Sequence, residues 1–247
     1  MRIHLSILFA LSSLGVHAEN VDPELNFDRP HGERGDPEFL LNVGWESRYV
    51  SEGRDNLDGA GLITGTFEFG WEYLSLGVWY ADSPSNSYNE LQINAALTKS
   101  WGDFEAYVGY THLRFPETND GHDHEVGGGF SWSGLPYELV IAFDFYNSID
   151  NSGTFYELSL GGEYEFCERW TFSPAIVFGM NQGYIGDGHD GANHIATSLG
   201  ISYALTDSIS IGAHAAYNFA LDRQVARAGD ALLKDFFHTG VGVSWEF

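Results

Sequence analysis

The chain has 247 residues and a formal net charge of −24 at pH 7, from 35 aspartate and glutamate residues against 11 lysine and arginine residues. This charge argues against a nucleic-acid partner, because binding to phosphates requires lysine and arginine side chains. Aromatic residues make up 15% of the chain, which argues against a highly charged disordered protein. Cys167 is the only cysteine, so an intrachain disulfide is excluded, and the length fits a single all-β domain.

Residues 1–18 have the features of a secretory signal peptide. Arg2 provides a basic start, a short apolar stretch follows, and Val16-His17-Ala18 forms a small-residue cleavage pattern. The apolar stretch is too short to span a bilayer as a helix. Residues 19–37 are polar, contain proline and show no period, so we expect a flexible periplasmic lead-in.

From Phe39 onward the sequence alternates between apolar and polar residues, the pattern of a half-buried β-strand. In the first stretch Val43, Trp45 and Tyr49 share the apolar face. The same alternation predicts further strands over 63–69, 74–80, 90–98, 104–111, 125–132, 137–145, 156–166, 171–179, 194–203, 208–219 and 238–247. These are about twelve strands of about ten residues, the length that a tilted strand needs to cross a bilayer. We therefore predict that residues 38–247 form a transmembrane, up-and-down antiparallel β-barrel.

The joins between the predicted strands alternate in length. Short joins fall at 70–72, 100–103, 133–136, 167–170 and 205–207, and longer polar joins fall at 51–60, 81–88, 114–123, 147–154, 180–192 and 220–235. Outer-membrane barrels have short periplasmic turns and longer external loops. Tryptophan lies at or beside four of the short joins, at Trp71, Trp101, Trp132 and Trp170. Such residues are expected to form an aromatic girdle at the periplasmic interface.

The last strand ends in alternating apolar residues: Val241, Val243, Trp245 and Phe247. A bilayer barrel must close its last strand onto its first, so an ordered chain end is expected. This end is similar to the C-terminal signature of bacterial outer-membrane proteins, which the barrel-assembly machinery reads. The resemblance implies outer-membrane lipid and that machinery as partners, and the outer membrane of a Gram-negative cell as the location.

The stretch 41–83 looks like the opening of the TorF-type porin family. In that family a first strand ends in a Tyr-Val/Phe-x-x-Gly pattern, a Gly-rich second strand follows, and the third strand contains Gly-x-Trp. The matching residues are Tyr49, Val50, Gly53, Gly77, Val78 and Trp79. The sequence departs from the family at Glu52, where a basic residue is usual, although Arg54 follows Gly53. The resemblance covers the first three strands best and implies passive transport.

The polar faces of the predicted strands are strongly acidic, and we expect them to line the barrel interior. The candidate lumen-lining residues are Glu46, Arg48, Glu68, Glu90, Glu105, Glu125, Glu138, Asp144, Glu157 and Glu163, with Glu165 and Glu246 on the same faces. A barrel of this size lies between filled eight-stranded barrels and open sixteen-stranded porins. We therefore predict a narrow, water-filled bore that favours cations and small hydrophilic solutes over anions, without a cofactor.

Other interpretations stay open at this point. Alternation alone is compatible with a secreted soluble β-sandwich. The interior could instead be plugged, giving a structural or receptor barrel without transport. A lipid hydrolase would need a pair such as His194 with Ser198 or His214 with Ser210, but no third orienting group is evident.

A "GHD" element occurs twice in predicted external loops, at 121–123 and 188–190. These elements could bind a divalent cation. Their spacing, however, matches no compact metal-binding pattern, and we assign no metal ligands.

Overall fold

The computed structural model describes residues 37–117 and 121–247. The predicted signal peptide and the predicted lead-in up to residue 36 lie outside the described residues. No helix in the described ranges is long and apolar enough to cross a membrane.

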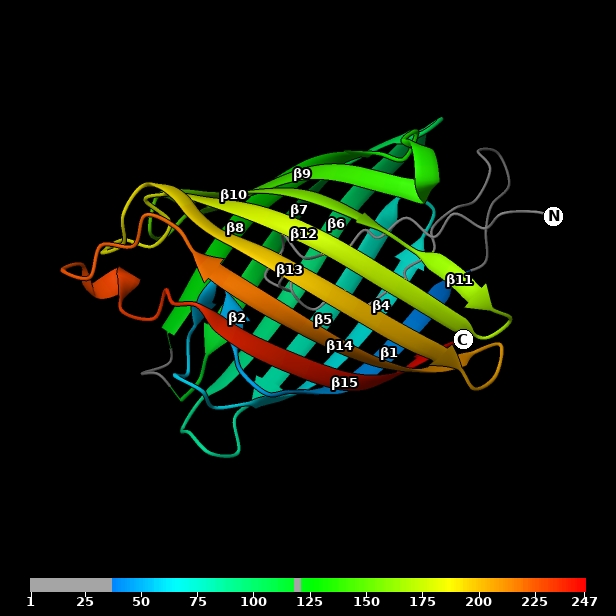
Figure 1. Ribbon diagram of the computed structural model, residues 1–247, viewed down its shortest axis with the longest axis horizontal. Helices are drawn as coiled ribbons and strands as arrows, with labels where there is room; N and C mark the ends of the chain where they lie inside the picture. The colour runs from blue at the N-terminus through cyan, green and yellow to red at the C-terminus, as the bar shows by residue number, and fades with distance from the viewer. Residues whose placement is uncertain (1–36, 118–120) are drawn as a thin grey trace.

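Twelve antiparallel strands close into a barrel (Figure 1). The strands are β1 (Glu38–Glu46), β4 (Leu62–Trp71), β5 (Leu74–Asp82), β6 (Asn89–Trp101), β7 (Phe104–Phe115), β8 (Gly121–Trp132), β9 (Leu139–Ser148), β10 (Gly153–Gly162), β11 (Tyr164–Cys167), β12 (Trp170–Gln182), β13 (Gly191–Ala204), β14 (Ile209–Ala220) and β15 (Phe236–Glu246). Both β10 and β11 pair with β12, so they occupy one position in the wall. The predicted up-and-down barrel is confirmed.

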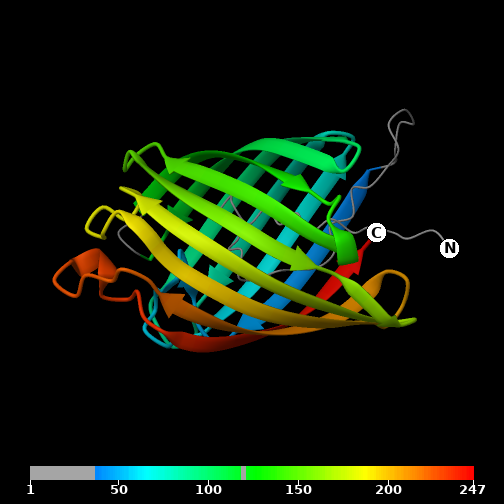
Figure 2. The same ribbon diagram turned by 45° about the horizontal axis from the view of Figure 1, so that its top comes forward.

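The barrel closes where β1 pairs with β15, in the register Leu40↔Glu246 to Glu46↔Gly240. We call this pairing the seam. In Figure 2 the red closing strand lies beside the blue first strand, and all strands run obliquely around the barrel. Closure joins the two edges of the sheet, so each of the twelve wall positions has hydrogen-bonded neighbours on both sides, although the short β11 itself pairs only with β12.

The outer face of the wall is apolar. Large side chains point outward along the strands, and examples are Trp45 at 46% exposed, Leu97 at 56% and Val108 at 62%. A water-soluble monomer rarely exposes apolar patches of this extent, whereas a bilayer covers such a band. This face therefore argues against the soluble sandwich and for a barrel surrounded by lipid.

The two ends of the barrel differ in their joins. At the end that carries Glu38 and the C-terminus, the joins are 72–73, 102–103, 133–138, 168–169 and 205–208, and we call this the terminal end. At the opposite end, which we call the loop end, they are 47–61, 83–88, 116–120, 149–152, 183–190 and 221–235. The join 149–152 is shorter than predicted, because β9 and β10 pair as far as Ser148↔Gly153. The exposed side chains of Trp71, Trp101 and Trp170 all lie at the terminal end, as an interfacial girdle requires.

The chain after β1 departs from the predicted alternation. β1 ends at Glu46, so Tyr49 does not continue the outer apolar face. Its side chain is instead buried inside the barrel, where it packs with Leu62, Trp79 and Ala81. The prediction for Tyr49 was therefore wrong, because the backbone turns inward directly after the strand.

Deletion of Phe247 is expected to reduce assembly into membranes severely. The N–H of Phe247 donates to the carbonyl of Phe39 (3.0 Å) and the N–H of Phe39 donates to the carbonyl of Phe247 (3.1 Å). The two rings also stack, with centroids 5.5 Å apart. The heat-modifiable folded fraction in purified membranes measures assembly, and Phe247→Ala, which keeps the backbone bonds, separates the role of the ring. Wild-type assembly of the deletion variant would contradict the expectation.

Candidate functional site: the barrel interior

Seven of the predicted acidic site residues lie on barrel strands with buried side chains. Each occupies the polar face of its strand and is at most 8% exposed. They are Glu46 on β1, Glu68 on β4, Glu90 on β6, Glu105 on β7, Glu125 on β8, Asp144 on β9 and Glu157 on β10. They form an arc around the interior from β1 to β10, with only β5 lacking an acidic member of this set. Their role in solute passage stays a prediction.

The other predicted site residues lie outside this arc. Arg48 lies in the join after β1 with a side chain 33% exposed, and Glu163 is half-buried between β10 and β11. Glu138 requires a correction, because it is exposed in the short 3-10 helix η2 (Pro136–Glu138) at the terminal end. Tyr137 and Glu138 have φ angles of 64° and 56°, which breaks the extended backbone, so β9 starts only at Leu139. The side chains of Glu165 and Glu246 are exposed.

Neutral donors hold several of the buried carboxylates. Glu90 accepts hydrogen bonds from the hydroxyl of Tyr49 (2.6 Å) and from the amide of Gln92 (2.7 Å). Asp144 accepts one from the hydroxyl of Tyr107 (2.8 Å). Buried carboxylates need such partners, because burial without hydrogen bonds is costly. Hydroxyl and amide donors meet this need without cancelling the negative charge.

A small hairpin folds from the first long join into the barrel at the loop end. It consists of β2 (Val50–Ser51) and β3 (Arg54–Asp55), and we call it the inward hairpin (Figure 1). The carbonyl of Gly53 at its tip accepts a hydrogen bond from Asn218 of β14 (2.8 Å). The carbonyl of Glu52 accepts one from Asn193 of β13 (2.6 Å), and the Glu52 carboxylate accepts one from the hydroxyl of Tyr146 of β9 (3.1 Å). The hairpin therefore contacts β13 and β14, which lie close to the seam, and β9, which lies on the opposite side of the wall.

The tip of the inward hairpin requires glycine. Gly53 has a φ of +67°, which disfavours any residue with a side chain. A Cβ at this position would lie 2.4 Å from the imidazole of His194. A bulge between β12 and β13 places both His194 and its neighbour Asn193 inside the barrel, so two consecutive residues contact the hairpin.

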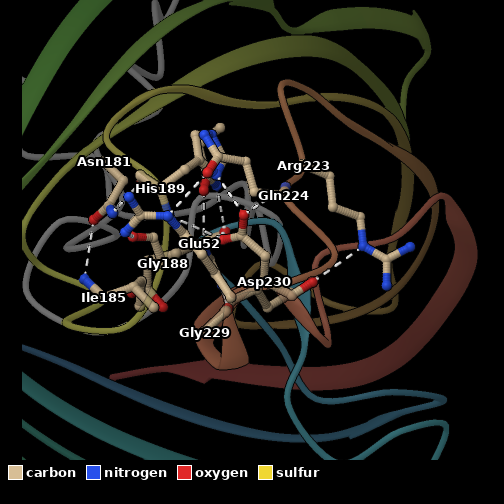
Figure 3. A network of polar contacts seen from close by, with 12 residues as sticks. Glu52, Asn181, Ile185, Gly188, His189, Arg223, Gln224, Gly229 and Asp230 are labelled. Atoms are coloured by element: carbon tan, nitrogen blue, oxygen red, sulfur yellow. Dashed lines mark hydrogen bonds and ion pairs between the residues drawn. The ribbon is translucent and has the colours of Figure 1, made fainter.

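A buried ionic network fixes the inward hairpin to the long joins (Figure 3). The Arg54 guanidinium lies 3.3 Å from the Asp230 carboxylate and donates to the carbonyl of Gly229 (2.8 Å) and to Asn193 (2.9 Å). Asp230, at the end of the 3-10 helix η3 (Ala228–Asp230), also accepts hydrogen bonds from the ring of His189 (2.8 Å) and the N–H of Gln224 (2.8 Å). Three separate segments thus meet at one carboxylate.

The Asp230 carboxylate stays ionised in this network. Burial raises its pKa, but the hydrogen bonds from Gln224 and His189 outweigh burial and hold the pKa below its usual range. A carboxyl group whose pKa is lower in the folded state contributes stability above its unfolded value of about 3.9, and the contribution is lost as the pH falls through the folded value. The Asp230 carboxylate is therefore charged near neutral pH.

Between the hairpin and the terminal end the interior contains a cavity of about 90 Å³. Its lining combines apolar residues such as Trp79 and Ile201 with polar ones, which are Asn42, Glu46, Thr64, Thr66, Ser202, Ser210, His214 and Ser244. The interior therefore has a filled section near the loop end and an open space of mixed lining next to it.

The catalytic and metal interpretations made from sequence do not find support in the geometry. Four residues span about 13 Å along a strand, so His194 and Ser198, or His214 and Ser210, are too far apart for a hydrogen bond. Of the two "GHD" elements, the first lies in β8, where Asp123 accepts hydrogen bonds from Ser148. The second lies in the join 183–190, where His189 pairs with Asp230. They do not form a common site.

The inward hairpin and the tyrosine donors were not predicted from the sequence. Tyr107 was recoverable, because the alternation places it on the polar face of its strand. No local pattern marks Asn193 or Asn218 as partners of the hairpin. Both are more than one hundred residues from the segment that they bind.

No family model matches the chain, and no curated protein matches it by sequence. Among solved structures the chain is similar to the KdgM porin, with a TM-score of 0.58, 11% identity and coverage of 84% of this chain and 99% of that one. It is similar to the NanC porin, with a TM-score of 0.55, 14% identity and coverage of 84% and 98%. It is also similar to the COG4313 outer membrane channel from Pseudomonas putida F1, with a TM-score of 0.51, 10% identity and coverage of 89% and 100%.

Identities this low show a shared fold and nothing finer. Together with the closed twelve-stranded barrel and its apolar outer face, the fold makes this chain an outer-membrane protein. The resemblance to the TorF-type porins is not confirmed. What the comparisons show is the barrel fold that this chain shares with these porins and this channel.

Proposed function

We propose that the protein is a porin-like channel for passive diffusion of small hydrophilic solutes, with a preference for cations. The single observation that carries the proposal is the arc of seven buried carboxylates around the interior. Uncharged hydroxyl and amide groups donate hydrogen bonds to Glu90, Glu105 and Asp144. Rings of carboxylates lining a pore attract cations and repel anions.

The acidic interior also bears on the class of solute. One similar solved structure is the KdgM porin in complex with disordered oligogalacturonate, a polyanion. The carboxylates of this chain would repel such a ligand. We therefore propose small cations and small neutral polar molecules as its solutes.

The inward hairpin supports a second candidate, a plugged barrel without transport. The hairpin crosses the interior, and the buried Arg54–Asp230 pair fixes it there. A channel requires a path for solutes beside the hairpin or movement of the hairpin. A plugged barrel requires neither.

Liposome swelling separates the two candidates. Proteoliposomes containing the refolded mature chain are diluted into isotonic solutions of neutral sugars of increasing size, such as arabinose and raffinose. The channel proposal predicts fast swelling with arabinose and much slower swelling with raffinose, because the hairpin narrows the interior. Swelling no faster than in protein-free liposomes, with a barrel shown to be folded by heat-modifiable migration, would favour the plugged barrel.

A further inference from the structure

Three adjacent strands at the seam place a glutamate, a glycine and a histidine in one row. In the pairing register Glu46 of β1 lies opposite Gly240 of β15, and Gly240 lies opposite His214 of β14. The glycine leaves the space between the two longer side chains open. A Cβ on Gly240 would lie 2.3 Å from Glu46 Oε1 and 2.3 Å from His214 Cε1. Over this gap, His214 Nε2 comes to 3.2 Å from Glu46 Oε2.

A second histidine completes the group. His238 precedes Gly240 by two residues on β15, so its side chain lies on the same inner face. The ring centroids of His214 and His238 are 5.8 Å apart and the rings meet edge to face. One ligand atom from each of Glu46, His214 and His238 lies within 4.8 Å of the others, and in the described ranges no other group of three such side chains meets this condition.

The facing atoms of two of these side chains lack hydrogen bonds. Glu46 Oε2 and His214 Nε2 are buried and make no hydrogen bond within the described part of the chain, although they lie near each other. A buried acceptor or donor without a partner is costly and calls for an explanation, such as an ion. A bound cation would satisfy both atoms at once.

We propose that Glu46, His214 and His238 form a binding site for a divalent transition-metal ion, for which Zn²⁺ is the best fit. Imidazole and carboxylate ligands suit Zn²⁺, whereas Ca²⁺ and Mg²⁺ prefer oxygen ligands throughout. Ligands about 2.0–2.1 Å from a tetrahedral zinc lie about 3.3 Å apart, close to the separation of Glu46 and His214. Both residues also line the cavity of about 90 Å³, which has room for a water as a fourth ligand.

Such a site would connect β14, β15 and β1 across the seam. It does not depend on transport, because a metal can bind to these residues whether the barrel conducts or is plugged. Metal binding and conductance are therefore tested separately, and either can fail alone.

Isothermal titration calorimetry of the refolded, chelator-treated barrel in detergent tests the site with Zn²⁺ as the probe. We expect one Zn²⁺ per chain, and at least about 100-fold weaker binding in His214→Gln and in His238→Gln, since even outer-shell changes cost up to about that factor. His122→Gln is the matched control, because His122 is exposed and its ring lies 5.8 Å from that of His124 in a separate histidine cluster. The control should bind as the wild type does.

A second measurement needs no variant. Co²⁺ in place of Zn²⁺ should give the intense visible bands of a four-coordinate site in the wild-type barrel, and Zn²⁺ should abolish them by competition. Gly240→Ala, which fills the gap between Glu46 and His214, should weaken these bands. Absence of heat up to about 1 mM Zn²⁺, or binding that is lost in His122→Gln and kept in His214→Gln, would overturn the proposal.

Discussion

Replacement of Arg54 by alanine is expected to raise the single-channel conductance severalfold. The Arg54 side chain is 3% exposed and lies within 3.3 Å of Asp230, which is fully buried. Removing one partner of a buried ion pair costs about 3–5 kcal/mol, because the other charge stays buried without compensation. The variant also loses the hydrogen bonds to Asn193 and to the carbonyl of Gly229. The inward hairpin should then leave the interior for most of the time.

Planar-bilayer recordings of the variant and the wild type at equal salt measure this effect. Arg169→Ala is the control, because Arg169 is exposed in the join 168–169 at the terminal end, where its side chain donates to the carbonyl of Leu205. Gly53→Ala should act in the same direction as Arg54→Ala, since alanine is disfavoured at a φ of +67° and its Cβ would clash with His194. Unchanged conductance in both variants, with folded barrels, would show that the hairpin does not narrow the pore.

A triple variant, Glu68→Gln, Glu105→Gln and Glu157→Gln, is expected to lose most of the cation preference. Each amide keeps the size of the side chain and removes one buried negative charge from a different strand. The hydrogen bonds of the inward hairpin to Tyr146, Asn193 and Asn218 do not involve these three side chains, so the hairpin should keep those bonds in the variant. In a KCl gradient the wild-type reversal potential should have the sign of K⁺ selectivity, and in the variant it should move toward zero. The conductance should change less.

The matched control also replaces three glutamates by glutamine, but at exposed positions in the joins between strands. Glu72→Gln, Glu117→Gln and Glu168→Gln alter exposed residues, whose charges are screened by salt over about 10 Å at 0.1 M. This control should keep the wild-type reversal potential. An equal shift in both triple variants would mean that net charge, and not the interior arc, determines selectivity.

The wall of the barrel could be predicted from the sequence, because lipid imposes one repeating requirement on every strand. Alternation placed Val43 and Trp45 on the outer face and Glu46 and Trp79 on the inner face, and the burial of each agrees. The prediction failed where this requirement ends. Tyr49 keeps the period of β1, yet the backbone has already turned inward, and no neighbouring residue signals the turn.

For the interior, the sequence predicts which residues face inward but does not predict which of them are in contact. Which of them meet depends on the register between strands that are far apart in sequence. The Glu46–Gly240–His214 row exists because β1 closes on β15, and a shift of the register by one residue would turn alternate side chains to the other face. The contacts of Arg54 with Asn193 and Asp230 depend likewise on the tertiary fold, as does the position of Glu138 on the unusual backbone before β9.

The most direct test of the proposed cation-preferring channel is the current through the refolded wild-type barrel in a planar bilayer that separates two KCl concentrations. We expect discrete conductance steps and a reversal potential whose sign shows that K⁺ permeates more readily than Cl⁻. A correctly inserted barrel that stays silent, or one that passes Cl⁻ in preference to K⁺, would contradict the proposal.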